Sequence, residues 1–165
     1  MKSKTKVITI NKSGLSKISL TESGQYLFKL THAGAKLQLI GIFEAQSNQQ
    51  IRVNLTIHHL APSTQSAVVL KGVAQDQSVL QLTGLIKIDA HCPQTVSHLT
   101  QRILQASGQS RAEILPNLEI LTDDVVCTHA ASISAIDESQ LFYLMSRGLS
   151  RSQAKKHIVA GFLHF

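Results

Sequence analysis

Cys127 and His129 are the residues of this chain whose types and spacing could do chemistry. They stand two positions apart in a strand-like stretch, and residues i and i+2 of a strand project from the same face. Thiolate and imidazole are both ligands for iron and zinc. Two ligands do not close a metal site, so other segments or a second chain must supply more. The alternative is that Cys127 is a small buried apolar residue and His129 a hydrogen-bonded surface residue.

Other polar side chains fit structural roles better. Adjacent residues of a strand point to opposite faces, so His91 and Cys92 are not expected to share a ligand. Asp123 and Asp124 diverge in the same way and are expected to form a turn instead of a carboxylate pair. Polar surface positions are expected for three further histidines, His58, His59 and His98. The sequence has no Gly-rich phosphate loop, so any ATP chemistry must belong to a partner.

The elements that must position Cys127 and His129 are short strands. Between Val7 and about Val126, short runs alternate between apolar and polar residues, which is typical of strands. Gly, Asn, Ser, Asp or Pro separates the runs, with breaks expected near Gly24, Gly34, Ser47, Pro62, Gly72, Gly84 and Cys92-Pro93. The runs themselves are Tyr26–Leu30, Lys36–Ile40, Ile51–Ile57, Ser66–Leu70, Val79–Leu82, Leu85–Ile88 and Leu118–Leu121.

Regular short strands indicate a sandwich, a barrel or a β-helix. The chain contains neither Asn-Gly nor Asp-Gly, the dipeptides that favour two-residue hairpins, and this points to a parallel β-helix. The segment Ser97–Ala112 fits a helix or a strand, of which we favour the strand. The open end of a β-helix exposes unpaired backbone groups, so an unprotected face should bind a partner chain.

The C-terminal segment has helix signals instead. Asp137 and Gln140 form a capping-box pattern that recurs at the start of a second helix. Gly148 lies where the first helix should end. The sequence therefore predicts a β-helical core over residues 1–135 and a two-helix hairpin over residues 136–165.

Composition narrows the class of protein. Of 165 residues 43% are hydrophobic and only 4% aromatic, so the core should be aliphatic, and the net charge is +6. The basic residues gather near the two ends of the chain, and no aromatic residues are interleaved with them. We therefore expect these residues to lie in solvent-exposed termini and not to form a nucleic-acid site. No leader and no apolar run of membrane-spanning length stands in the sequence. With two cysteines, we expect a soluble protein of the cytoplasm or an equivalent reducing compartment, with free thiols and no disulfide.

From about His59 to Phe162 the chain resembles the SufB/SufD family, the scaffold subunits of the SUF iron–sulfur cluster assembly machine. The resemblance is closer to SufD, because Ile120 stands where SufB has a cysteine proposed to take part in cluster assembly. His129 matches the implicated histidine of SufD. The motifs that carry the resemblance are Ala61-Pro62-Ser63-Thr64, Lys71-Gly72-Val73, Gly84–Ile88, Pro116–Ile120, Asp123-Asp124-Val125, Cys127–Ala130, Leu141–Leu144 and Ser146-Arg147-Gly148.

The resemblance implies a mainly β fold, a shortened right-handed parallel β-helix followed by a C-terminal helical hairpin, without the family's long N-terminal region. It implies a non-enzymatic SufD-like subunit that pairs with a SufB-like chain or with itself. No cofactor would bind stably, and a transient iron–sulfur cluster would form at a subunit interface near His129 and Cys127. A SufC-like ABC ATPase would dock on Leu141, Phe142, Tyr143, Arg147, Gly148 and Arg151. The alternative is a β-helical structural or homo-oligomerisation module without a cluster role.

Overall fold

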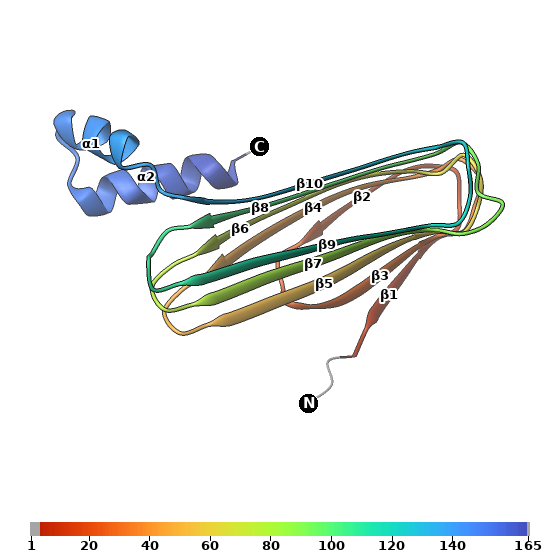
Figure 1. Ribbon diagram of the computed structural model, residues 1–165, viewed down its shortest axis with the longest axis horizontal. Helices are drawn as coiled ribbons and strands as arrows, with labels where there is room; N and C mark the ends of the chain where they lie inside the picture. Colours follow the sequence, from red (N-terminus) through yellow and green to blue (C-terminus); the bar gives the residue numbers. More distant parts are fainter. Residues whose placement is uncertain (1–3, 165) are drawn as a thin grey trace.

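The computed structural model describes residues 4–164, in which successive strands alternate between two parallel sheets that face each other (Figure 1). One sheet has the order β1-β3-β5-β7-β9 and the other β10-β8-β6-β4-β2. The strands are β1 Lys6–Ile10, β2 Gly14–Leu20, β3 Gly24–Leu30, β4 Ala35–Ala45, β5 Gln50–His59, β6 Gln65–Ala74, β7 Val79–Ile88, β8 Thr95–Gln105, β9 Arg111–Ile120 and β10 Val125–Ala135.

Each coil of the chain stacks directly on the one before it. Tyr26 pairs with Leu55, Leu55 with Gly84, and Gly84 with Pro116, all in parallel register. This is the stacked-coil arrangement of a parallel β-helix. The predicted fold class is confirmed, and the segment Ser97–Ala112, for which a strand was favoured, contains most of β8 and the start of β9.

The interior is filled by the alternate residues of both sheets. Period-two alternation places every second side chain between the sheets, and those side chains form one aliphatic core with few aromatic members, as the composition predicts. The largest fully buried members are Phe28, Phe43, Leu30, Leu37, Leu39, Leu55, Ile57, Leu70, Leu80, Leu82, Ile86 and Ile88.

Two expected breaks are wrong, because Gly72 and Gly84 lie inside strands β6 and β7. The predicted runs Val79–Leu82 and Leu85–Ile88 are therefore one continuous strand. Both glycines face the interior, where a Cβ atom would collide with the opposite sheet. At Gly84 it would lie 2.6 Å from Leu99 Cδ2. These glycines serve close packing inside the β-helix and not chain reversal.

Gly84→Ala should destabilise the protein by about 1–3 kcal/mol, the usual cost of an added methyl in a well-packed core. The matched control is Gly108→Ala, because a Cβ at Gly108 would meet nothing within 4 Å. Urea unfolding of both variants measures the difference. Equal free energies of unfolding for the two variants would contradict a tightly packed interior at Gly84.

The corners between strands use left-handed residues that stack from coil to coil. Gly34, Ser63, Gln94 and Asp124 all have positive φ and precede β4, β6, β8 and β10. Gln94 N–H donates to Asp124 O at 2.7 Å, and so ties neighbouring corners together. These bends replace the hairpin dipeptides that the sequence lacks, and they confirm the turn predicted at Asp123 and Asp124.

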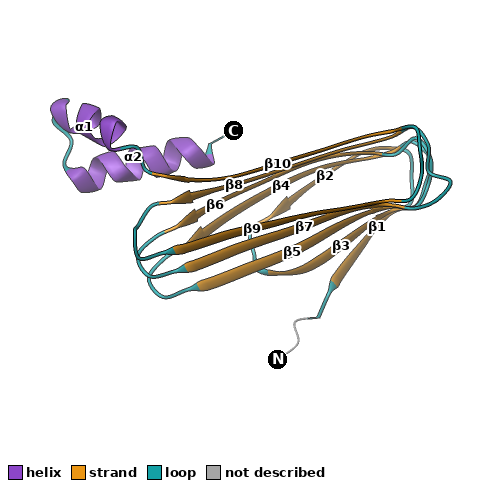
Figure 2. Ribbon diagram, in the orientation of Figure 1, coloured by secondary structure: helices purple, strands orange, loops and turns teal. Residues whose placement is uncertain are grey.

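The two predicted helices are α1 Glu138–Ser146 and α2 Arg151–Leu163, which lie beyond the end of β10 and outside the stacked sheets (Figure 2). At Asp137 the side chain accepts from Ser139 N–H, whereas the full capping box forms only at the start of α2. Gly148 follows α1 with positive φ, and its N–H donates to Met145 O, as in a Schellman motif.

Helix α2 is attached to the β-helix through a small apolar cluster. Val159 packs with Val73 of β6 and Leu104 of β8. The hairpin is therefore supported by the last coils and not only by its connection to β10. Neither of the two described helices is long and apolar enough to cross a membrane.

Candidate functional site

Cys127 and His129 lie on the inner face of β10, the last strand of its sheet. In the parallel register Cys127 pairs with Ser97 and His129 with Leu99, both of which are buried between the sheets. The two candidate ligands are only half-buried, because no described strand stacks on β10 from the other side. The predicted pair therefore shares one face, and that face borders the open end of the β-helix.

Gln101 orients the His129 ring. Its Oε1 atom lies 2.9 Å from His129 Nε2, and an amide oxygen can only accept. Nε2 therefore donates, which leaves the lone pair on Nδ1 free for a ligand. Burial lowers the pKa of His129, so the ring is neutral at neutral pH and able to bind a metal. A side chain that holds the second ring nitrogen of a metal-binding histidine is a common feature of metal sites.

Gln101 was missed by sequence reasoning. It is fully buried, and its Nε2 has no hydrogen-bond partner among the described residues. Its side chain occupies the space left by Gly84, where a Cβ would lie 3.0 Å from Gln101 Oε1. No local signal in the sequence could have found this arrangement, since it depends on how β7, β8 and β10 stack.

The thiol of Cys127 is partly buried. It packs against the aliphatic core, and burial raises the pKa of its thiol. At neutral pH the thiol is therefore protonated, and a metal must displace that proton to bind. No group of three or more His, Cys, Asp or Glu side chains that could hold a metal occurs among residues 4–164. Cys127 and His129 are therefore two candidate ligands, too few to close a metal site by themselves.

The open end of the β-helix is apolar. Strands β9 and β10 are the outermost strands of their sheets, and the inward-facing residues of this last coil remain exposed: Leu118 at 49%, Ile120 at 39% and Ile133 at 46%. Elsewhere in the fold, residues on these inward rows are buried by the next coil. The end of the β-helix thus combines unpaired strand edges with uncovered core residues.

Of the residues predicted for docking on the helical hairpin, some are buried and others are exposed. Leu141 is buried, whereas Phe142 is 75% and Tyr143 57% exposed. The Arg147 guanidinium lies 5.2 Å from the Tyr143 ring centroid, and Arg151 makes a two-pronged ion pair with Glu138 at 2.8 and 3.1 Å. The other predicted residue, Gly148, forms the bend after α1.

A hollow accompanies the exposed aromatic residues. It has a volume of about 420 Å³ and is lined by Tyr143 and Leu144 of α1 and by His157 and Ile158 of α2. The hairpin thus presents an apolar surface with exposed rings beside a groove. Large exposed apolar side chains next to a hollow are typical of a protein–protein contact.

The expected surface position of His59 is wrong, because its side chain is completely buried. Its Nδ1 lies 2.8 Å from Thr64 Oγ1 and its Nε2 3.1 Å from Ser66 Oγ. Ser66 Oγ in turn lies 2.6 Å from Ser97 Oγ on the next coil. Burial, and then the neighbouring His58, lower the pKa of His59 to about 4. The ring is therefore a neutral member of a satisfied internal hydroxyl network.

The remaining candidates have structural positions. His58 lies 3.0 Å from Asp89 Oδ1, and His98 is exposed on the outer face, beside Thr128. Cys92 is buried and its neighbour His91 is exposed, so the two do not share a face, as predicted. None of these residues joins the Cys127–His129 pair.

Comparison with known proteins gives one consistent result. The family described as "SUF system FeS cluster assembly, SufBD core domain" matches residues 9–162. An iron–sulfur cluster assembly SufBD family protein of Mycobacterium bovis is 33% identical over 134 residues, 81% of this chain and 16% of that protein. A SufBD family protein of Mycobacterium leprae is 33% identical over 137 residues, covering 78% and 35% respectively.

A protein named for one member of the family is also similar. The iron–sulfur cluster assembly protein SufB of Bacillus subtilis is 32% identical over 130 residues, 79% of this chain and 28% of SufB. The chain thus spans between 16% and 35% of the length of these relatives.

Proposed function

Because the chain belongs to the SufBD core family of the SUF system, we propose that it serves iron–sulfur cluster assembly as a non-enzymatic, SufD-like subunit. It pairs through its β-helix with a SufB-type chain or with a second copy, and it docks a SufC-like ABC ATPase through its helical hairpin. The observation that carries the proposal is the position of Cys127 and His129 at the uncovered end of the β-helix, where a second chain can complete their ligand set.

The pairing step is supported by the last coil. Two unpaired strand edges, β9 and β10, run alongside the exposed inward residues Leu118, Ile120 and Ile133. A second β-helix end placed on this surface pairs the free backbone groups and covers the apolar side chains at once. The same contact brings the partner's residues next to His129.

The cluster is cargo in this proposal, and the chain supplies two of its ligands. His129 offers Nδ1, since Gln101 holds Nε2, and Cys127 offers a thiolate once its proton leaves. The partner chain supplies the others, so the cluster stays bound only while the two chains are together. Ile120 is exposed at 39% on the same open end, at the position where SufB carries a cysteine, which supports the SufD-like role.

The ATPase dock is proposed for the exposed face of α1. Phe142 and Tyr143 supply the apolar contact, and Arg147 adds charge beside the Tyr143 ring. Aromatic side chains usually carry most of the affinity of such an interface, and charges mainly steer association. Leu141 contributes indirectly, because it is buried and keeps α1 in place.

Replacing Phe142 with aspartate should weaken ATPase binding at least about tenfold, because it places a charge in an apolar contact. The measurement is binding of the purified full chain to the SufC-type ATPase of its own organism, by size-exclusion chromatography with light scattering and by titration. Leu15→Asp is the matched control, since Leu15 is an exposed leucine, 56% accessible, at the other end of the fold on β2.

A stable complex that is lost only in the Phe142 variant supports the docking proposal. If the wild-type chain does not bind the ATPase and elutes as a homodimer, the result supports instead a structural or homo-oligomerisation module without a cluster role. Equal binding by wild type and Phe142→Asp places the dock elsewhere on the chain.

A further inference from the structure

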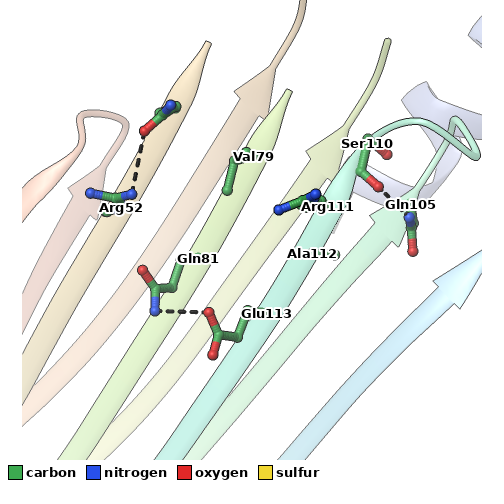
Figure 3. Close-up of a pocket in the computed structure, with 9 residues that line it drawn as sticks. Arg52, Val79, Gln81, Gln105, Ser110, Arg111, Ala112 and Glu113 are labelled. Atoms are coloured by element: carbon green, nitrogen blue, oxygen red, sulfur yellow. Dashed lines mark hydrogen bonds between the residues drawn. The ribbon is translucent and has the colours of Figure 1, made fainter. Parts of the chain in front are cut away.

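A second polar site lies on the outer face of the β1-β3-β5-β7-β9 sheet, away from Cys127 and His129. It is a cavity of about 620 Å³ near the beginnings of β5, β7 and β9. Figure 3 shows Arg52 and Arg111 on either side of the strand that carries Val79 and Gln81. The proposed function uses none of these residues.

The parallel register sets the relation between the two arginines. Arg52 pairs with Gln81, whereas Val79 pairs with Arg111, so the arginines flank β7 diagonally. Strands are about 4.8 Å apart, which places the β5 and β9 backbones about 10 Å from each other. Two long arginine side chains can therefore reach one group that lies above Val79.

The charges in the cavity are not balanced internally. The Arg111 guanidinium has no hydrogen-bond or ion-pair partner among residues 4–164, whereas its backbone N–H donates to Ser78 O at 2.8 Å. Arg52 Nη2 donates only to a neutral amide, Gln50 Oε1, at 3.3 Å. The one carboxylate, Glu113, accepts from Gln81 Nε2 at 2.9 Å. Neither guanidinium is paired with a carboxylate, so both are free to bind an anion.

We propose that this cavity binds a small organic oxyanion, a carboxylate or a phosphate ester, with its anionic group between Arg52 and Arg111. Guanidinium groups bind both kinds of anion through two parallel hydrogen bonds. The cavity has the size of a small-molecule site and exceeds that of a single anion. The free lone pairs of Glu113 accept a hydroxyl or amine hydrogen from the rest of the ligand.

The test is calorimetric titration of the full chain with three probes that share a glycerol skeleton: glycerol 3-phosphate, glycerate and glycerol. Saturable binding of at least one of the two anions, and none of glycerol, is expected. Stronger binding of glycerol 3-phosphate assigns the site to phosphate esters, and stronger binding of glycerate assigns it to carboxylates. Neither result depends on cluster assembly or on ATPase docking.

Arg52→Gln and Arg111→Gln should each weaken anion binding about tenfold or more, the usual loss for one charge-assisted hydrogen bond. Both residues are exposed, so the variants should keep the fold, which circular dichroism checks. The matched control is Arg102→Gln, an exposed arginine on β8 of the other sheet. The proposal is overturned if neither anion binds, if glycerol binds equally well, or if Arg102→Gln weakens binding as much as Arg111→Gln.

Discussion

Replacing His129 with alanine should lower iron retention at least about tenfold when the chain and the SufB-type partner that we propose for it are reconstituted anaerobically with iron and sulfide. Because Gln101 Oε1 accepts from Nε2 at 2.9 Å, the lone pair of the neutral ring is on Nδ1. The residue is half-buried on β10, the outermost strand of its sheet. Loss of even an outer-shell partner of a metal ligand typically costs about 10–100-fold in metal affinity, and loss of the ligand costs no less. Bound iron per complex and its visible absorption provide the measurement.

His98→Ala is the matched control for that experiment. His98 is also a histidine of this sheet, on the neighbouring strand, but it is exposed on the outer face beside Thr128. Gln101→Leu extends the test, because it removes the group that orients His129 while it keeps the size of a buried side chain. Its iron retention should fall between those of wild type and His129→Ala. Equal and negligible iron in all variants would support the structural module instead.

Acid should destabilise the chain by about 3 kcal/mol as the pH falls from about 6.5 to about 4, because His59 is buried as the neutral ring. An unfolded histidine titrates near its ordinary pKa of 6.5, whereas burial lowers the pKa of His59 in the folded chain to about 4. Between about pH 6.5 and pH 4 the His59 ring is therefore protonated in the unfolded state and neutral in the folded state. Each unit of difference corresponds to about 1.4 kcal/mol.

The loss of stability at low pH, and not at high pH, follows from the lowered pKa of His59. The contribution of His59 to stability is complete above about pH 6.5, declines as the pH falls, and levels off below about pH 4. Urea unfolding at a series of pH values measures it. His59→Gln should show a flatter profile through the same window, whereas His32→Gln, which changes an exposed histidine, should keep the wild-type slope. A wild-type profile without a decline would show that the internal network accommodates the charged ring.

The order of elements and the shared face of Cys127 and His129 could be predicted from the sequence, because both depend on local periodicity. Alternation of apolar residues identifies a strand wherever it stands, and the αL position of Gly148 marks the end of a helix without reference to the rest of the fold. Residues two apart on a strand share a face in any sheet. The absence of hairpin dipeptides also favoured the stacked-coil arrangement that the structure has.

Stacking decided the rest, because it joins residues that lie a whole coil apart in the chain. Glycine is a residue type that favours turns, so Gly72 and Gly84 suggest turns in the sequence. They stand inside strands because the side chains of the opposite sheet leave no room there for a Cβ atom. His59 has the polarity of a surface residue, and it is buried because hydroxyl groups from β6 and the preceding corner meet both of its ring nitrogens. The Gln101–His129 contact and the arginine pair across β7 depend in the same way on the register between coils. That register is set by the packing of the whole interior, so no single segment of the sequence contains it.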